Sequence, residues 1–296
     1  MLHKNMQHKL ICPVCSEALE AAPSGASVVC RHGHLFDMAK QGYLNLLLSQ
    51  HKKSKQPGDT SEMVQARTTF LNSGFYQGIA DFLINLGLQP CLEEQTQLKA
   101  FHYCDLACGE AYYTSQIHHY LESRLAPNAK LFSSGIDISS PAIKAACKRN
   151  SEIKWLVASL ARIPLADHSQ DLVSGLFFHF DLAEVLRILK PEGYFVMLTT
   201  GPKHLIELRE LIYEQIKPEK IKDFSQQNKG LEYQQSLYYT EHQTLSGAAS
   251  ILSLLAMTPH FWRCKPDKKQ QLASLPSLVL TLDIQIDIFK NTARTI

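Results

Sequence analysis

The chain has 296 residues, of which 45% are hydrophobic and 20% are charged, and its net charge is +2 at pH 7. This length predicts one main domain of about 200 residues with one or two smaller attachments. The sequence has no apolar run long enough to span a bilayer and no secretory signal at its N-terminus, so we expect a cytoplasmic protein without a membrane partner. The small net charge excludes a polycation, so any nucleic-acid binding must come from local patches.

The first forty residues contain a set of side chains that could bind a metal. Cys12 and Cys15 are separated by two residues, and Cys30 is followed closely by His32 and His34. Thiolate and imidazole are the ligands of structural zinc, and four protein ligands leave no open position for chemistry. We therefore predict a structural Zn²⁺ site, and the spacing alone leaves either histidine as its fourth ligand. The other five cysteines lack framework spacing, so we expect no disulfides.

A polar, basic stretch follows this module at residues 50–58 and ends in Pro-Gly, as a linker or loop does. Asp59, followed by Glu62 three positions later, forms a capping pattern that predicts a helix ending near Gly74. A second amphipathic helix is expected from Tyr76 to about Leu86. These features divide the chain into a zinc-binding module (1–48), a basic linker with helices (49–97) and a main domain (98–296).

From about residue 98, short apolar segments alternate with helical ones. The expected strands are 99–106, 131–138, 155–158, 172–178 and 194–200, and the expected helices are 112–124, 140–149 and 182–189. Such alternation predicts an α/β fold with a parallel, doubly wound sheet. Further along, 204–216 has the pattern of an amphipathic helix, and segments 231–239 and 278–289 predict a pair of antiparallel strands.

A candidate ligand site lies where the first of these strands turns into the first helix, at residues 103–111. Open α/β sheets bind ligands at the carboxyl ends of their strands, and Gly109 would allow a close backbone approach. Asp137 ends the next strand and could accept hydrogen bonds from both ribose hydroxyls of a nucleoside cofactor, or simply cap a helix. Ser159 ends the third strand and could line an adenine pocket. The same spacing also fits a nicotinamide-dependent enzyme, and spacing alone does not decide.

Several segments resemble the bacterial 23S rRNA guanine-N1-methyltransferases, which join an N-terminal zinc finger to an S-adenosylmethionine-dependent, Rossmann-like domain. These segments are 12–15 with 30–45, 50–76, 105–114 and 201–213, and residues 257–259 with Trp262 add a fifth. The likeness covers nearly the whole chain. A zinc finger that runs into Phe-Asp-Met-Ala-Lys, at residues 36–40, is not a general feature of methyltransferases.

The resemblance implies a class I methyltransferase fold with S-adenosylmethionine and a structural Zn²⁺ as cofactors. It implies methylation of guanine N1 in a 23S rRNA hairpin of the hairpin-35 type, a homodimer, and no DNA partner. The implied zinc ligands are Cys12, Cys15, Cys30 and His34, which favours His34 over His32. Together with the strand pattern, it gives ten cofactor-binding candidates: Asp105, Ala107, Cys108, Gly109, Glu110, Ala111, Tyr112, Asp137, Ser159 and Leu160.

The chain departs from the family pattern in two places. The family turn Gly-Cys-Gly-Glu-Gly is Ala-Cys-Gly-Glu-Ala at residues 107–111. Ala111 is compatible with a glycine that serves helix packing, whereas a methyl group on Ala107 could strain the turn or crowd the methionine end of the cofactor. The family's Arg-Ile-Tyr-Ala-Pro loop after the fourth strand is replaced by Gly-Leu-Phe-Phe-His-Phe at residues 175–180. These changes could alter specificity, slow turnover or abolish activity.

Catalytic and RNA-binding residues are less well indicated. Guanine N1 carries a proton that some base must accept, and His179 is the nearest candidate, although a solvent-facing or satisfied histidine is the alternative reading. The candidate RNA contacts are Lys40, Lys52, Lys53, Lys55, Arg67 and His204. The basic linker could instead be a solvated segment, and Phe36 and Tyr43 either stack RNA bases or pack the core of the finger.

The leading hypothesis is therefore an S-adenosylmethionine-dependent rRNA guanine-N1-methyltransferase. The main rival is an RNA-binding protein that retains the fold with weak or lost methyl transfer. A third interpretation is methylation of a small molecule or a protein, for which the basic finger would be unnecessary.

Overall fold

The computed structural model describes residues 8–23, 25–48, 50, 57–93, 98–178, 182–216, 221, 223 and 230–293. Four of the candidate site residues, Lys52, Lys53, Lys55 and His179, lie outside this set. Across the described ranges, no helix is both long and apolar enough to cross a membrane.

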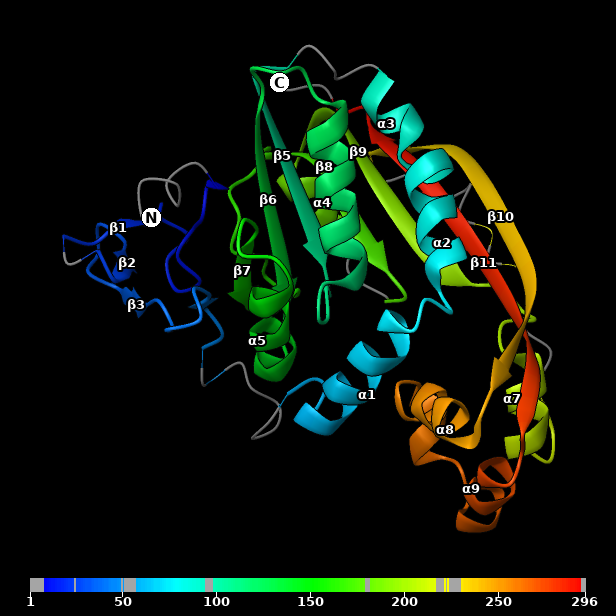
Figure 1. Ribbon diagram of the computed structural model, residues 1–296. Coiled ribbons are helices and arrows are strands. Elements are labelled where there is room, and N and C mark those ends of the chain that lie inside the picture. The colour runs from blue at the N-terminus through cyan, green and yellow to red at the C-terminus, as the bar shows by residue number, and fades with distance from the viewer. Residues whose placement is uncertain are drawn as a thin grey trace.

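The N-terminal module is a small antiparallel sheet of β1 (Glu20–Ala21), β2 (Ser27–Val29) and β3 (Leu35–Asp37), at one side of the molecule (Figure 1). It is joined to the rest of the chain by backbone hydrogen bonds: Ile11 N–H donates to the carbonyl of Pro164 at 3.1 Å, and Ala166 N–H donates to that of Lys9 at 2.9 Å. Its buried Cys12 packs in the same core as Leu165. The module is thus built into the larger fold by both backbone and core contacts.

The large sheet has eight strands in the order β10-β11-β9-β8-β5-β6-β7-β4. Their bounds are β4 (Leu44–Asn45), β5 (Ala100–Leu106), β6 (Lys130–Asp137), β7 (Lys154–Val157), β8 (Gln170–Leu176), β9 (Leu189–Thr200), β10 (Leu231–Ser246) and β11 (Ser277–Asn291). The strands from β4 to β9 run parallel, and β11 and β10 add an antiparallel edge. The predicted parallel sheet and the predicted late antiparallel pair are both confirmed. Because β5 lies between β6 and β8, the strand order reverses there, which is where open α/β sheets bind ligands.

Some of the helices around this sheet were predicted correctly from the sequence, and others were not. α4 (Tyr112–Arg124) and α5 (Ser140–Arg149) have the predicted bounds, and α6 (Leu182–Ile188) and α7 (Ile206–Ile212) are shorter than expected. The second predicted helix is α2 (Gln77–Phe82) followed by a π-helical turn, Leu83–Gly87. The sequence did not predict α3 (Gln89–Glu93), α8 (Ala248–Ala256), the 3₁₀ turn Pro259–Trp262 or α9 (Pro266–Ala273).

The cap of α1 (Ser61–Asn72) differs from the predicted one. Thr60 is the N-cap, and its hydroxyl accepts a hydrogen bond from Met63 N–H at 3.4 Å. Asp59 instead forms an ion pair with Arg67. In Figure 1, α1 lies beyond the arrowheads of the parallel strands, and it packs against α5 and α8. This helix therefore covers the carboxyl edge of the sheet, where the cofactor site was predicted.

Candidate functional site

The four predicted zinc ligands lie together. Cys12, Cys15, Cys30 and His34 each offer a ligand atom, and these atoms lie within 4.8 Å of one another. His34 Nδ1 is 3.6 Å from Cys12 Sγ and 3.3 Å from Cys30 Sγ, and the Sγ atoms of Cys15 and Cys30 are 3.6 Å apart. A tetrahedron with Zn–S and Zn–N bonds of about 2.3 and 2.1 Å has edges of roughly 3.4–3.8 Å, so these donors fit a Zn²⁺ ion. His32 is exposed and outside the group.

A tight turn brings His34 back to Cys30. Gly33 has a φ of +80°, and its N–H donates to the carbonyl of Cys30 at 2.9 Å. Burial raises the pKa of the Cys30 thiol, but hydrogen bonds from the backbone of His34 and His32 and from the side chains of Cys15 and His34 outweigh this effect and lower the pKa to about 6. The turn therefore favours the thiolate form that zinc binds.

The predicted cofactor turn connects β5 to α4. Ala107, Gly109 and Ala111 have φ values of +57°, +56° and +71°. Glycine adopts this left-handed backbone readily, whereas an alanine there is strained. Strain was expected at Ala107 alone, but Ala111 is strained as well, so its position requires more than close helix packing. A side chain added at Gly109 would meet only Arg67 Nη1, at 3.7 Å, so the turn is open above this glycine.

Asp137 fixes the turn from the neighbouring strand. One of its carboxylate oxygens accepts a hydrogen bond from Gly109 N–H at 2.9 Å, and the other accepts one from Ser139 N–H at 2.7 Å. Burial raises the pKa of this carboxyl, although the two amides oppose the shift. Each carboxylate oxygen can accept a further hydrogen bond, so Asp137 retains the capacity to bind ribose hydroxyls.

Asp105 and Glu110 support the turn from beneath. Asp105 accepts hydrogen bonds from the hydroxyls of Thr114 and, at 2.6 Å, Ser174, and burial raises its pKa to about 6. Glu110 forms an ion pair with Arg149 at 2.6 Å. Both carboxylates are only 2% exposed, so they hold the turn rather than line the open space above it.

The other predicted cofactor residues lie at the same edge of the sheet. Cys108 N–H donates to the carbonyl of Ile136 at 3.1 Å, and the Tyr112 hydroxyl donates to Gln77 at 2.9 Å. Ser159 follows β7, and its hydroxyl accepts a hydrogen bond from Ala161 N–H at 3.3 Å, next to the partly buried Leu160. The structure thus brings the ends of β5, β6 and β7 together, as the sequence predicted.

Arg67, a candidate RNA contact, lies over the cofactor turn. It forms an ion pair with Asp59 and donates to the carbonyl of Met257 at 3.4 Å. The carbonyl of Asp59 accepts a hydrogen bond from the Ser139 hydroxyl at 2.7 Å, so this segment is attached to the loop that follows Asp137. Arg67 is therefore part of a roof over the candidate cofactor site.

Four aromatic side chains, Tyr76, Tyr113, Phe177 and His204, form a group at the mouth of the site, and only His204 was a candidate from the sequence. Tyr76 and His204 are buried, and the Tyr76 hydroxyl is 3.1 Å from His204 Nε2. Asp283 N–H donates to His204 Nδ1 at 3.2 Å, and burial lowers the pKa of His204 to about 3. A neutral histidine that accepts at Nδ1 carries its proton on Nε2, so His204 donates to Tyr76. A buried, neutral His204 is unsuited to contact an RNA phosphate.

Within the described ranges, the other residues that were considered for RNA binding lie on or near the zinc module. Lys40 is exposed on the zinc module. Tyr43 is 7% exposed and packs in a core with Trp155, and Phe36 packs against the core that contains Cys12. Phe36 therefore packs against the core of the module, which was one of the two alternatives, whereas Tyr43 packs against residues of the main domain.

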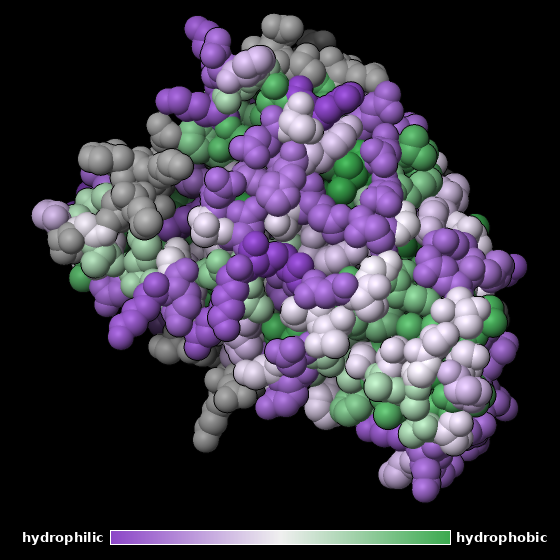
Figure 2. Space-filling model, in the orientation of Figure 1, coloured by the Kyte–Doolittle hydropathy of each residue, from purple (hydrophilic) through white to green (hydrophobic). Residues whose placement is uncertain are grey.

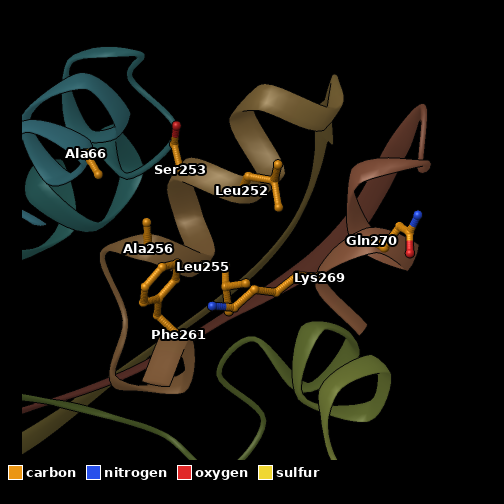
Figure 3. A pocket seen from close by; sticks show the side chains of 8 residues that line it. All are labelled: Ala66, Leu252, Ser253, Leu255, Ala256, Phe261, Lys269 and Gln270. Atoms are coloured by element: carbon orange, nitrogen blue, oxygen red, sulfur yellow. The ribbon is translucent and has the colours of Figure 1, made fainter. Parts of the chain in front are cut away.

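A separate hollow of about 530 Å³ lies between α1, α8 and α9 (Figure 3). Leu252, Leu255 and Phe261 line it, and Lys269 Nζ lies 3.7 Å from the centre of the Phe261 ring. On the face shown in Figure 2, hydrophobic atoms gather over this part of the molecule, while hydrophilic residues cover most of the rest. Its walls offer few polar groups, so we assign no chemistry to it.

Comparison with known proteins relates both sites to a family. Residues 10–55 match the zinc ribbon described as "RlmA, N-terminal", and residues 104–197 match a methyltransferase domain. The chain is 29% identical over 280 residues to YxjB of Bacillus subtilis (strain 168), provisionally named a 23S rRNA (guanine-N1)-methyltransferase, with 93% of this chain and 94% of YxjB covered. It is 26% identical over 293 residues to the 23S rRNA (guanine(748)-N(1))-methyltransferase of Streptomyces fradiae, with 94% of each covered. The chain thus joins an RlmA-type zinc ribbon to a methyltransferase domain.

Among solved structures, the YcgJ protein of Bacillus subtilis is 14% identical, with a TM-score of 0.46 over 71% of this chain and 98% of that one. The two matched ranges contain the zinc ligands, the cofactor turn, the end of β5, the strands β6, β7 and β8, and most of β9. Arg67, Tyr76 and His204 lie outside both ranges. Arg67 of the roof, and the Tyr76–His204 pair at the mouth of the site, thus belong to segments that neither match includes.

Proposed function

We propose that this chain methylates N1 of a guanine in a hairpin loop of 23S rRNA, with S-adenosylmethionine as the methyl donor and zinc as a structural ion. The observation that carries this proposal is the union of an RlmA zinc ribbon and a methyltransferase domain in one chain. The similarity to proteins named for this activity extends over 93% and 94% of the chain, so it includes both parts.

The proposed cofactor site is the open edge formed by the ends of β5, β6 and β7. The backbone of residues 107–111 would hold the methionine part, Asp137 would accept the ribose hydroxyls, and Ser159 and Leu160 would lie beside the adenine. When bound, S-adenosylmethionine supplies a methyl group on a sulfonium, which is already a good leaving group. Asp105 and Glu110 act as positioning residues, because both are buried beneath the turn.

The protein then has to orient the guanine and exclude water. Its nitrogen must lie in line with the methyl carbon, so the rigid groups at the mouth of the site determine the geometry of attack. His204 is not a suitable acceptor for the proton of guanine N1, because its Nδ1 already accepts a hydrogen bond from Asp283 N–H. We assign His204 and its partner Tyr76 to positioning, and we name no general base.

The proposed RNA surface is the zinc module with the basic linker. We propose three parts for the chain: residues 1–48 for RNA recognition, 49–97 as linker and roof helices, and 98–296 for methyl transfer. Lys40 and the linker lysines 52, 53 and 55 would contact phosphates. We further propose that the protein acts in the cytoplasm as a homodimer whose subunits jointly bind the hairpin.

Methyl transfer to a defined RNA tests this function. The purified, zinc-loaded protein is mixed with labelled S-adenosylmethionine and unmodified 23S rRNA hairpins, and the product is mapped by reverse-transcription stops, since an N1 methyl group blocks base pairing. We expect one stop at one guanine, and no label in a hairpin with adenine at that position. RNA binding without transfer at saturating cofactor would support the rival RNA-binding protein instead. Transfer to protein or small molecules that persists in a zinc-free Cys30→Ser variant would support the third interpretation.

A further inference from the structure

Phe177, directly after β8, has a backbone conformation that aromatic residues rarely adopt. Its φ is +58°, and its N–H donates to the carbonyl of Leu198 in β9 at 2.8 Å, which holds the strand end in this conformation. A bulky residue with positive φ is a true outlier, and such outliers persist where the surrounding structure enforces them, often at ligand sites. This strain therefore invites a functional explanation.

The side chain of Phe177 is also more exposed than an apolar ring at the end of a central strand should be. Phe177 is 38% exposed, although all the residues of β8, which ends just before it, are buried. β8 pairs with β5, whose end forms the cofactor turn, so the exposed ring lies beside the candidate cofactor site. An exposed aromatic at the mouth of a polar site is a common feature of ligand pockets.

Three rings support Phe177 from the protein side. The centre of its ring lies 5.9 Å from that of Tyr113, 6.4 Å from that of His204 and 6.5 Å from that of Tyr76. Tyr76 and His204 are fixed by their mutual hydrogen bond, and both are buried. These rings cover one part of the Phe177 ring and hold it in place. The part that stays exposed is free to stack against a planar ligand.

Tyr113, one of these three rings, carries a hydroxyl group. This hydroxyl is buried and has no hydrogen-bond partner among the described residues. Burial raises the pKa of Tyr113 well above its usual value, so the group is a neutral hydroxyl that can donate. Buried hydroxyls normally have a partner, so this one is available to a bound molecule.

We propose that Phe177 is the platform on which the target guanine stacks, and that Tyr113 donates a hydrogen bond to the edge of this base. The proposal rests on the proposed function and names the subsite that would hold its substrate. Every base has a flat face, and the stacked aromatic rings of proteins bind RNA bases that are turned out of a loop. The guanine carbonyl is an acceptor that matches the Tyr113 donor.

Replacement of Phe177 by glycine separates this role from a role in folding. Glycine tolerates a φ of +58°, so Phe177→Gly removes the ring and relieves the strained backbone at once. Hairpin RNAs carry 2-aminopurine in turn at each loop guanine, because the fluorescence of this base reports stacking. We expect one position at which the wild-type protein changes the fluorescence and Phe177→Gly does not, with unchanged cofactor binding and a melting temperature close to that of the wild type, because relief of strain offsets the lost ring contacts.

Two control variants also change aromatic side chains at or next to this position. Phe178→Leu changes the neighbouring exposed ring and should retain the signal, and Phe177→Trp should restore it by supplying another flat ring. In methyl transfer, Phe177→Gly should lower kcat/KM by about 5- to 150-fold, the range for loss of one stacked base. Tyr113→Phe should lower kcat/KM without altering the fluorescence.

The outcomes distinguish this proposal from the proposed function. A fluorescence change that persists in Phe177→Gly, or that occurs at no loop position with the wild-type protein, overturns the stacking platform. A change that depends on Phe177 in a protein that transfers no methyl group supports the platform while refuting the methyltransferase function.

Discussion

The two alanines of the cofactor turn provide a quantitative test of the structure. A left-handed backbone costs an L-residue about 1–2 kcal/mol, whereas glycine loses about 0.5–1 kcal/mol more conformational entropy than alanine on folding. Ala107 is partly exposed, so Ala107→Gly should stabilise the protein by about 0.5–1 kcal/mol. Ala111 is 0% exposed, and loss of its buried methyl group costs about 0.8 kcal/mol, so Ala111→Gly should be close to neutral.

Thermal unfolding measures this difference. For a domain of this size, 1 kcal/mol changes the melting temperature by about 2–4 °C, so Ala107→Gly should raise it by about 1–4 °C. The matched control is Ala145→Gly within α5, which removes the same atoms from an ordinary helical backbone and should destabilise by about 1 kcal/mol. If Ala107→Gly destabilises the protein as Ala145→Gly does, the turn is not strained and the reasoning fails.

Three further predictions concern protonation, zinc and RNA binding. Burial raises the pKa of Asp105 from 3.8 to about 6. The folded protein therefore holds a proton that the unfolded chain releases, and this carboxyl lowers stability as pH rises from about 4 to about 6. Asp105→Asn should remove about 2 kcal/mol of this pH dependence between pH 4.5 and pH 7 in urea unfolding, and equal slopes for the two proteins would contradict this prediction. Cys30→Ser should abolish zinc binding, measured by atomic absorption. It should also lower the melting temperature, because the zinc module shares its core with Leu165 of the main domain. The control variant Cys91→Ser, in another core, should retain the metal. Lys40→Ala should reduce the salt dependence of RNA affinity by about one unit of log–log slope, whereas Arg67→Ala should leave it unchanged because Arg67 pairs with Asp59.

The accuracy of the predicted elements follows the strength of local signals. α5 was predicted with its observed bounds because Ser139 caps it, accepting a hydrogen bond from Ala142 N–H at 3.2 Å, and Pro141 lies in its first turn. α8 has no such signal. Its sequence is almost entirely apolar and its N-cap is Gly247, so periodicity could not distinguish it from a buried strand.

The accuracy of the predicted site also depends on whether its residues are close together in the sequence. The zinc ligands lie within 23 consecutive residues, from Cys12 to His34, and their spacing identified three of them, with the histidine left open. The roof and mouth depend on long-range contacts: Arg67 and Met257 are 190 residues apart, and Tyr76 and His204 are 128 residues apart. No local pattern brings such residues together, because the sheet topology determines which segments meet at its carboxyl edge.

The altered turn also bears on the choice between an enzyme and an RNA-binding protein. If Ala107 crowds the cofactor, Ala107→Gly should raise the affinity for S-adenosylmethionine as well as the stability. If its methyl group only strains the backbone, stability should rise alone. The structure favours the second outcome, because Asp137 holds Gly109 and Arg149 holds Glu110, so the turn keeps its left-handed form without glycine at either end. A turn enforced by its neighbours in this way remains suited to a close ligand, so loss of the two glycines is by itself no argument against methyl transfer.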